Sequence, residues 1–307
     1  MSLGLPLVFH PDYSAPLPST HRFPMVKFRL LHEHLCRAGI ARPTQFHAPR
    51  RPPIEPILRV HSRDYVERYT DGRLDAREQR RIGLPWSAAL AHRTWIAVGG
   101  TLRTAELALE RGLAINLAGG THHAFPDYGS GFCIFNDVAI AARALLDRGA
   151  VERILILDLD VHQGDGTAWI FREEPRVFTC SMHCQSNFPR IKQASNRDVP
   201  LADGLADDDY LRALEALLPD LLAQTQPQLV FYNAGVDPHR GDRLGNLALS
   251  DSGLFRREQR VLDACLGAGI PVAAVIGGGY CEDFQELVFR HSLLFRAGRD
   301  AWKRHRL

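Results

Sequence analysis

Three side chains that bind metals or move protons follow an aliphatic run near the middle of the chain. The run is Ile154 to Leu157, and Asp158, Asp160 and His162 come directly after it. Aliphatic residues without a turn former predict a strand buried on both faces, as in parallel sheets. Side chains alternate in an extended chain, so the three polar groups are expected to point to one side. Such a cluster at a buried strand end needs a positive charge, and a divalent metal is the simplest candidate.

Similar groups follow three more expected strands. Open α/β sheets bind ligands beyond the carboxyl ends of their strands, so these groups are expected to meet the first cluster. Four such strand ends together predict a hydrolytic metal site. The additional groups are His122 and His123 after Leu113 to Leu117, Asp237 after Leu229 to Tyr232, and Tyr280 after Val272 to Ile276.

The ligand types indicate a catalytic metal rather than a structural one. We expect Asp160, His162 and Asp237 to hold it, because three protein ligands leave room for water and substrate. The metal would polarise a carbonyl and lower the pKa of bound water. Zinc is the first candidate, and ferrous iron accepts the same ligands.

Hydrolysis of an amide also needs a proton acceptor for water and a proton donor for the leaving amine. His122 and His123 can supply both. Each histidine needs a partner on its other ring nitrogen, and Asp158 and Asp165 are the carboxylates within reach. Tyr280 can donate its hydroxyl to the oxyanion opposite the metal.

Less specific interpretations of these residues exist. A lone aspartate after a strand is usually a turn residue or a helix N-cap, and Asp165 could be only that. Cys180, His183 and Cys184 could bind zinc, but no fourth ligand is apparent and the segment itself resembles a buried strand.

Composition excludes several classes of protein. The 307 residues are 45% hydrophobic and 23% charged, with a net charge of +2, as in an ordinary globular protein. No basic run with interleaved aromatics predicts nucleic-acid binding, and no apolar run is long enough to cross a membrane. The N-terminus lacks the pattern of a signal peptide, and the six scattered cysteines suit reduced thiols, so we expect a cytoplasmic protein.

Strands and helices alternate after residue 112. This alternation predicts one parallel sheet covered by helices on both faces, in a single domain over residues 1–307. The paired glycines Gly99 and Gly100 inside an expected helix, Ala88 to Arg111, predict close packing against another element. The charged segment Asp71 to Arg81 is expected to form a loop. The other expected helices are Asn136 to Arg148, Gly166 to Glu173, Asp207 to Gln224, Ser252 to Leu266 and Glu282 to Arg304, and Val177 to Ser181 is expected to be a further strand.

Four segments resemble the signature set of the zinc-dependent histone deacetylase superfamily, in matching order from about residue 20 to 290. The resemblance implies the arginase/deacetylase fold, a three-layer α/β/α sandwich around a mainly parallel sheet of about eight strands. His21 to Met25 and the compact length resemble most the class IV branch, the deacetylase 11 type, and its bacterial relatives. The segments are Gly119 to Ala124, Gly131 to Asp137, Asp158 to Gly166 and Gly277 to Tyr280.

The resemblance also assigns roles to individual residues. It agrees with the metal ligands, the histidine pair and the tyrosine named above, and makes His123 the general base and acid. It implies an acyl-lysine tunnel and an internal acetate channel. It further implies a structural monovalent cation, usually potassium. The matching residues are Gly131, Phe132, Phe188 and Leu244 for the tunnel, Arg22 for the channel, and Asp158 and Ser181 for the cation.

The resemblance implies hydrolysis of acetyl or longer acyl groups from lysine Nε in peptides or proteins. One alternative is a small-molecule amidase that acts on acetylpolyamines or serves acetoin utilisation. Another is a non-catalytic module that binds acyl-lysine. The related arginase branch would need two metals and more carboxylates than this site offers. Acyl-chain length, natural substrate and oligomeric state stay open.

Overall fold

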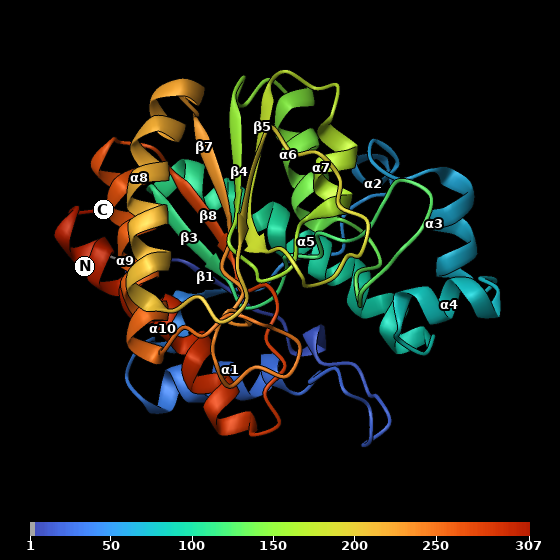
Figure 1. Ribbon diagram of the computed structural model, residues 1–307. Coiled ribbons are helices and arrows are strands. Elements are labelled where there is room, and N and C mark those ends of the chain that lie inside the picture. The colour runs from blue at the N-terminus through green and yellow to red at the C-terminus, as the bar shows by residue number, and fades with distance from the viewer. Residues whose placement is uncertain (1–3) are drawn as a thin grey trace.

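The structure, a computed structural model, describes residues 4–307 and contains one eight-stranded sheet with helices on both faces (Figure 1). The strand order is β2-β1-β3-β8-β7-β4-β5-β6, and every neighbouring pair is parallel. The predicted α/β/α sandwich is therefore confirmed. The strands are β1 (Leu7–Val8), β2 (Phe46–His47), β3 (Leu113–Asn116), β4 (Ile154–Asp158), β5 (Val177–Cys184), β6 (Arg197–Leu201), β7 (Leu229–Asn233) and β8 (Val272–Val275).

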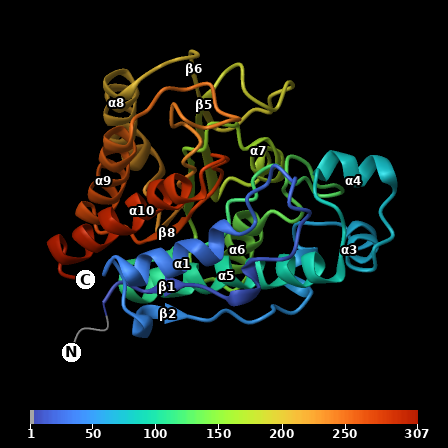
Figure 2. The same cartoon turned by 90° about the horizontal axis from the view of Figure 1, so that it is seen from below.

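Two groups of helices enclose the sheet. On one face α5 packs against β3, β8 and α6, and on the other α9 packs between α8 and α10, while α1 packs on α10 (Figures 1 and 2). The helices are α1 (Lys27–Arg37), α2 (Glu55–Leu58), α3 (Arg63–Thr70), α4 (Ala76–Ile82), α5 (Ala88–Arg111), α6 (Asp137–Asp147), α7 (Asp165–Phe171), α8 (Asp207–Thr225), α9 (Asp251–Gly267) and α10 (Phe284–Arg304).

The glycine pair in α5 allows close packing, as predicted. A Cβ atom on Gly99 would lie 2.0 Å from the backbone oxygen of Arg50, and one on Gly100 would lie 1.9 Å from the Tyr13 hydroxyl. Neither distance is compatible with a side chain. The glycines therefore let the N-terminal segments lie directly on α5.

The segment expected as a loop, Asp71 to Arg81, contains the helix α4, so that prediction was wrong. The Asp75 side chain accepts hydrogen bonds from the backbone of residues 77 and 78, and the Glu78 carboxylate accepts one from the backbone of Asp75. This reciprocal capping begins the helix, and Gly83 ends it with φ 77°. The Asp-x-x-Glu spacing and the following glycine were the sequence signals of this short, polar helix.

The three strands that apolar runs did not predict are β1, β2 and β6. β2 and β6 form the two edges of the sheet, and β1 lies between β2 and β3. β1 and β2 have two residues each, and β6 (Arg197–Leu201) contains a proline and two charged residues. Edge strands are covered less than central ones, so their sequences need not be aliphatic. β5 also extends three residues beyond the predicted Ser181 because its second half pairs with β6.

One buried histidine, His61, connects Phe125 with Asn136, the residue before α6. His61 is 1% exposed; its Nδ1 lies 3.0 Å from the Phe125 carbonyl, and its Nε2 accepts from the backbone N–H of Asn136 at 2.9 Å. Both contacts are satisfied by a neutral ring that carries its proton on Nδ1. Burial lowers the pKa of His61 to about 4, and this effect exceeds the opposing effect of the Phe125 and Pro126 backbone.

This histidine should make stability depend on pH. Because the folded-state pKa lies below the usual value near 6.5, the stabilisation is complete above that value and is lost as the pH falls towards 4. We expect the His61 contribution to the free energy of unfolding to fall by about 3 kcal/mol over that range. His61→Gln should flatten the pH dependence measured by urea unfolding, since His123 and His239 remain in both proteins. Parallel curves for the two proteins would contradict this.

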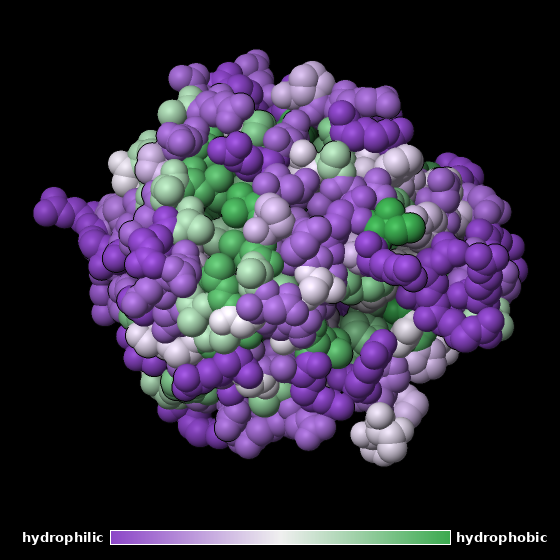
Figure 3. Space-filling model, in the orientation of Figure 1, coloured by the Kyte–Doolittle hydropathy of each residue, from purple (hydrophilic) through white to green (hydrophobic). Residues whose placement is uncertain are grey.

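The molecular surface in the first view is mostly hydrophilic, with apolar side chains gathered in patches between hydrophilic ones (Figure 3). Within residues 4–307, every helix is too short or too polar to cross a membrane.

Candidate active site

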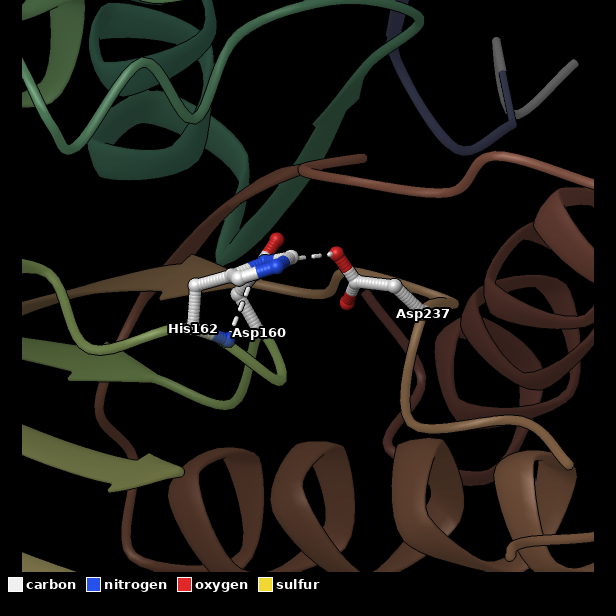
Figure 4. A group of neighbouring side chains, drawn as sticks. All are labelled: Asp160, His162 and Asp237. Carbon is white, nitrogen blue, oxygen red and sulfur yellow. Dashed lines mark hydrogen bonds and ion pairs between the residues drawn. The ribbon is translucent and has the colours of Figure 1, made fainter. Parts of the chain in front are cut away.

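Asp160, His162 and Asp237 converge beyond the carboxyl ends of β4 and β7. Their ligand-type atoms all lie within 4.8 Å of one another, and all three residues are buried. The His162 Nδ1 lies 3.0 Å from Asp160 Oδ1 and 3.3 Å from Asp237 Oδ2, so the ring sits between the two carboxylates (Figure 4). Within residues 4–307 this is the one group of three such side chains close enough to share an ion.

The two buried carboxylates of the site carry negative charge that a divalent metal would neutralise. Burial and the Asp160 carboxylate raise the pKa of Asp237 to about 7, because two negative charges are forced together away from water. Asp237 Oδ2 is also buried, and its contact with His162 Nδ1 at 3.3 Å is an ion pair without hydrogen-bond geometry. A cation at this point would relieve both costs. Two carboxylates and one imidazole suit zinc or ferrous iron.

Backbone groups hold the two carboxylates in place. Asp160 Oδ2 accepts from the backbone N–H of Gly278 at 2.7 Å, and Asp237 Oδ1 accepts from that of Val161 at 3.0 Å. A Cβ on Gly278 would lie 2.0 Å from Asp237. The glycine turn after β8 therefore has to be free of side chains where it closes over the site.

The structure places each histidine of the pair against the carboxylate expected for it. His122 Nδ1 lies 2.6 Å from Asp158 Oδ2, and His123 Nδ1 lies 2.7 Å from Asp165 Oδ1. The two rings are neighbours, with centroids 4.0 Å apart. In both rings the carboxylate contact is made by Nδ1, which leaves Nε2 as the other nitrogen that can exchange a proton.

The two histidines have opposite protonation preferences. Burial disfavours a charge on His122, but the Asp158 and Asp160 carboxylates outweigh it and raise its pKa to about 9. Burial and the neighbouring His122 lower the pKa of His123 to about 4, against the effect of Asp165. At neutral pH, His123 is therefore the ring with a free lone pair, and His122 carries the positive charge.

Asp137, the first residue of α6, positions the histidine loop. Its carboxylate accepts from the backbone N–H groups of Gly120 and Thr121, and from the hydroxyls of Thr101 and Thr121. Asn136 takes the capping role and accepts from the Ala139 N–H at 3.0 Å. The role of the Asp137 side chain could not be assigned from the sequence, because helix capping and loop support use the same residue types.

A cavity of about 280 Å³ leads from the surface to this cluster. Its walls include the four residues expected to form a tunnel, and His123, His162 and Tyr280 also line it. Phe188 stands perpendicular to the His123 ring at 4.8 Å between centroids, and the Phe132 and Tyr280 rings are 5.7 Å apart. The four tunnel residues are Gly131, Phe132, Phe188 and Leu244.

The turn before Phe132 requires a glycine. Gly131 has φ 53°, and a Cβ there would lie 2.7 Å from the His123 ring and 3.1 Å from the Phe188 ring. The glycine thus lets the tunnel wall lie close to the His123 ring.

Arg22 does not lie in an internal channel, so that expectation was wrong. Its side chain is exposed and stacks over the Phe132 ring, 5.0 Å from the centroid, at the mouth of the cavity. A nearby basic side chain that is buried is that of Lys27, the first residue of α1. Lys27 lines an inner cavity of about 40 Å³ together with Asp160 and Arg93.

Lys27 is held by the glycine turn after β8. Its Nζ donates to the backbone oxygens of Gly277 at 3.3 Å and Gly279 at 3.5 Å. Burial lowers its pKa to about 8, against the attraction of Asp237 and Asp160. The resemblance pointed to Arg22 instead, because the sequence does not show which residues of 21–27 turn inward.

Asp158 and Ser181, the expected side-chain ligands of a monovalent cation, are direct partners in the β4–β5 register. Asp158 Oδ1 accepts from the Asn233 amide at 3.0 Å, and Ser181 Oγ lies 3.0 Å from a ring nitrogen of His183. The cation itself stays a prediction. His183 and its neighbours Cys180 and Cys184 lie along β5 and form no ligand cluster.

Comparison with known proteins agrees with this geometry. Residues 21–292 match the family described as "Histone deacetylase domain", which covers most of the chain. The chain belongs to the histone deacetylase family. Deacetylase relatives share its sequence over long spans. An uncharacterized protein of Picosynechococcus sp. is 59% identical over 98% of this chain and all of its own length.

Relatives whose names state a function are more distant. A "Probable deacetylase" of Archaeoglobus fulgidus is 30% identical, over 89% of this chain and 80% of its own length. "Acetoin utilization protein AcuC" of Staphylococcus aureus is 32% identical, over 74% of this chain and 64% of its own length. Among solved structures, the HD domain of HDA15 superposes with a TM-score of 0.82 and 20% identity, over 97% of this chain and 88% of that one. That structure supports the deacetylase fold; membership of class IV stays a prediction.

Proposed function

We propose that this chain is a metal-dependent amide hydrolase that removes acetyl groups from lysine Nε. The observation that carries the proposal is the buried group of Asp160, His162 and Asp237 at the inner end of an aromatic cavity. A neutral, linear amide suits a narrow apolar channel, and the family and its deacetylase relatives support this reaction class.

Asp160, His162 and Asp237 would hold the metal, zinc or ferrous iron. The chemistry that such an ion supplies when bound is polarisation of the scissile carbonyl and a lower pKa for water. Asp158 and Ser181 would hold a potassium ion beside it, as the resemblance implies.

The protons are moved by the chain itself. His123, neutral at pH 7, accepts a proton from water at Nε2 and returns it to the leaving amine. Asp165 fixes the ring orientation and its tautomer. His122, held protonated by Asp158, places a positive charge beside the developing negative one.

Tyr280 stabilises the oxyanion. Burial and the nearby Asp160 carboxylate raise the pKa of Tyr280 well above its usual value. Its hydroxyl therefore stays protonated and can donate a hydrogen bond to the oxyanion. Its backbone N–H donates to Asp242 at 2.7 Å, which anchors the residue where the glycine turn ends.

The inner cavity argues for a short acyl group. Its volume of about 40 Å³ is only a few times the roughly 10–15 Å³ of cavity that one water molecule needs. A methyl group or a released acetate fits there, whereas an octanoyl chain would displace packed side chains. Lys27 at this cavity would bind the acetate carboxylate, the role that we had expected for Arg22.

Turnover of one peptide with acetyl-, octanoyl- or myristoyl-lysine tests the proposal, with zinc-reconstituted protein and acetylspermidine as the competing substrate. We expect release of the free lysine peptide to be fastest with acetyl. Preference for acetylspermidine would make the protein a small-molecule amidase. Stoichiometric peptide binding without turnover would make it an acyl-lysine binding module.

A further inference from the structure

The mouth of the outer cavity carries three arginines. Arg22, Arg80 and Arg81 line it, all three are exposed, and among the described residues that line the cavity there is no carboxylate. They come from two segments far apart in sequence, the stretch before α1 and the end of α4. His21 Nε2 contacts the Gly83 carbonyl at 2.9 Å and joins these segments.

Two of the guanidinium groups are held by aromatic rings. Arg22 lies over the Phe132 ring, and Arg81 lies over the Tyr128 ring at 4.5 Å from the centroid. Stacking of this kind orients a guanidinium without neutralising its charge. The donors of both groups therefore stay available at the rim of the tunnel.

Neighbouring carboxylates are engaged with other arginines. Glu78, on the same helix as Arg80 and Arg81, pairs with Arg68 at 2.7 Å. Glu282 and Arg243, which lie close in sequence to the cavity residues Tyr280 and Leu244, pair with each other at 3.0 Å. Within the described part of the chain, no carboxylate lies within ion-pair distance of the three arginines at the mouth, so their positive charge is uncompensated.

We propose that Arg22, Arg80 and Arg81 select acyl-lysine peptides with acidic residues beside the acyl-lysine. This inference rests on the proposed function, in which the lysine stem fills the tunnel and the peptide backbone lies at the mouth. Side chains that flank the acyl-lysine then meet the guanidinium groups, which bind carboxylates in bidentate geometry. Polycationic amines are repelled by the same charge, so acetylpolyamines are poor substrates.

Three acetyl-lysine peptides test the inference, identical except for Glu, Gln or Lys on both sides of the acetyl-lysine. Both kcat/KM and the dissociation constant, by fluorescence anisotropy, are measured with full-length, zinc-reconstituted protein. We expect kcat/KM for the Glu peptide to exceed that for the Lys peptide by on the order of tenfold at low salt. The difference should narrow at high salt because exposed charges are screened.

Charge reversal at the mouth should reverse the order. In the Arg80→Glu, Arg81→Glu double variant, kcat/KM for the Lys peptide should equal or exceed that for the Glu peptide. In the Arg80→Gln, Arg81→Gln double variant, the difference in kcat/KM between the two peptides should only become smaller. The matched control is Arg37→Glu with Arg306→Glu, an equal change in charge at exposed positions that do not line the cavity. The control should keep the wild-type ratio.

The outcomes separate the inference from the proposed function. Equal constants for the Glu and Lys peptides, or preference for the Lys peptide or acetylspermidine, would overturn the inference even if turnover is fast. Faster turnover of free Nε-acetyl-lysine, whose own carboxylate reaches the mouth, than of any peptide would overturn its peptide part. If the Glu peptide bound more tightly than the Lys peptide but neither was turned over, the proposed function would be overturned and the inference supported.

Discussion

Asp237→Asn should remove both the bound metal and the turnover. The substitution keeps the size of the side chain but removes one of the two negative charges that face His162. Loss even of a residue that only supports a ligand typically costs 10–100-fold in affinity or activity, so loss of a ligand should reduce turnover to less than about a hundredth. Metal content per chain and kcat/KM for the acetyl-lysine peptide measure the two effects.

Asp263→Asn is the matched control for this experiment. Asp263 contacts Arg304 and His305 at the surface and lies outside both cavities. It should keep wild-type metal content and turnover. An Asp237→Asn protein that retains one metal per chain and full activity would contradict the ligand assignment.

Tyr280→Phe should slow the chemical step and leave substrate binding almost intact. The ring still lines the tunnel beside Phe132, but the hydrogen bond to the oxyanion is lost. Removal of one such donor costs about 10²–10³-fold in kcat. Steady-state kinetics with the acetyl-lysine peptide should therefore show a lower kcat at a nearly constant KM.

A second tyrosine separates this effect from a general loss of structure. Tyr210 is fully buried in α8 and lines neither cavity, so Tyr210→Phe should keep kcat near the wild-type value. If Tyr280→Phe raised KM and left kcat unchanged, the hydroxyl would serve in binding and not in the reaction.

The interior of this fold was predictable because its sequence pattern has a direct physical cause. The five strands expected from apolar runs, β3, β8, β7, β4 and β5, are neighbours at the centre of the sheet, where burial on both faces demands aliphatic residues. The edge strands lack that demand, and α4 is polar because only its last residue, Ile82, is buried. Capping signals, not hydrophobicity, would have identified α4.

The candidate site was predictable where a strand end presents its ligands directly. Asp158 is the last residue of β4, and Asp160 and His162 follow it within four residues, so strand geometry brings the three together. Loops decide the remaining positions, and there the motif resemblance was insufficient: Lys27, and not Arg22, lines the inner cavity. The charge of the mouth was equally invisible, since it depends on which arginines lack a carboxylate partner.

Titration of metal-free protein with zinc tests the central claim most directly, with release of the free lysine peptide as the signal. We predict no turnover without metal, a linear rise with added zinc, and a plateau at one equivalent per chain, because one group of three ligands is present in residues 4–307. Full turnover by the metal-free protein would contradict the account, and so would a plateau that requires two metal ions per chain.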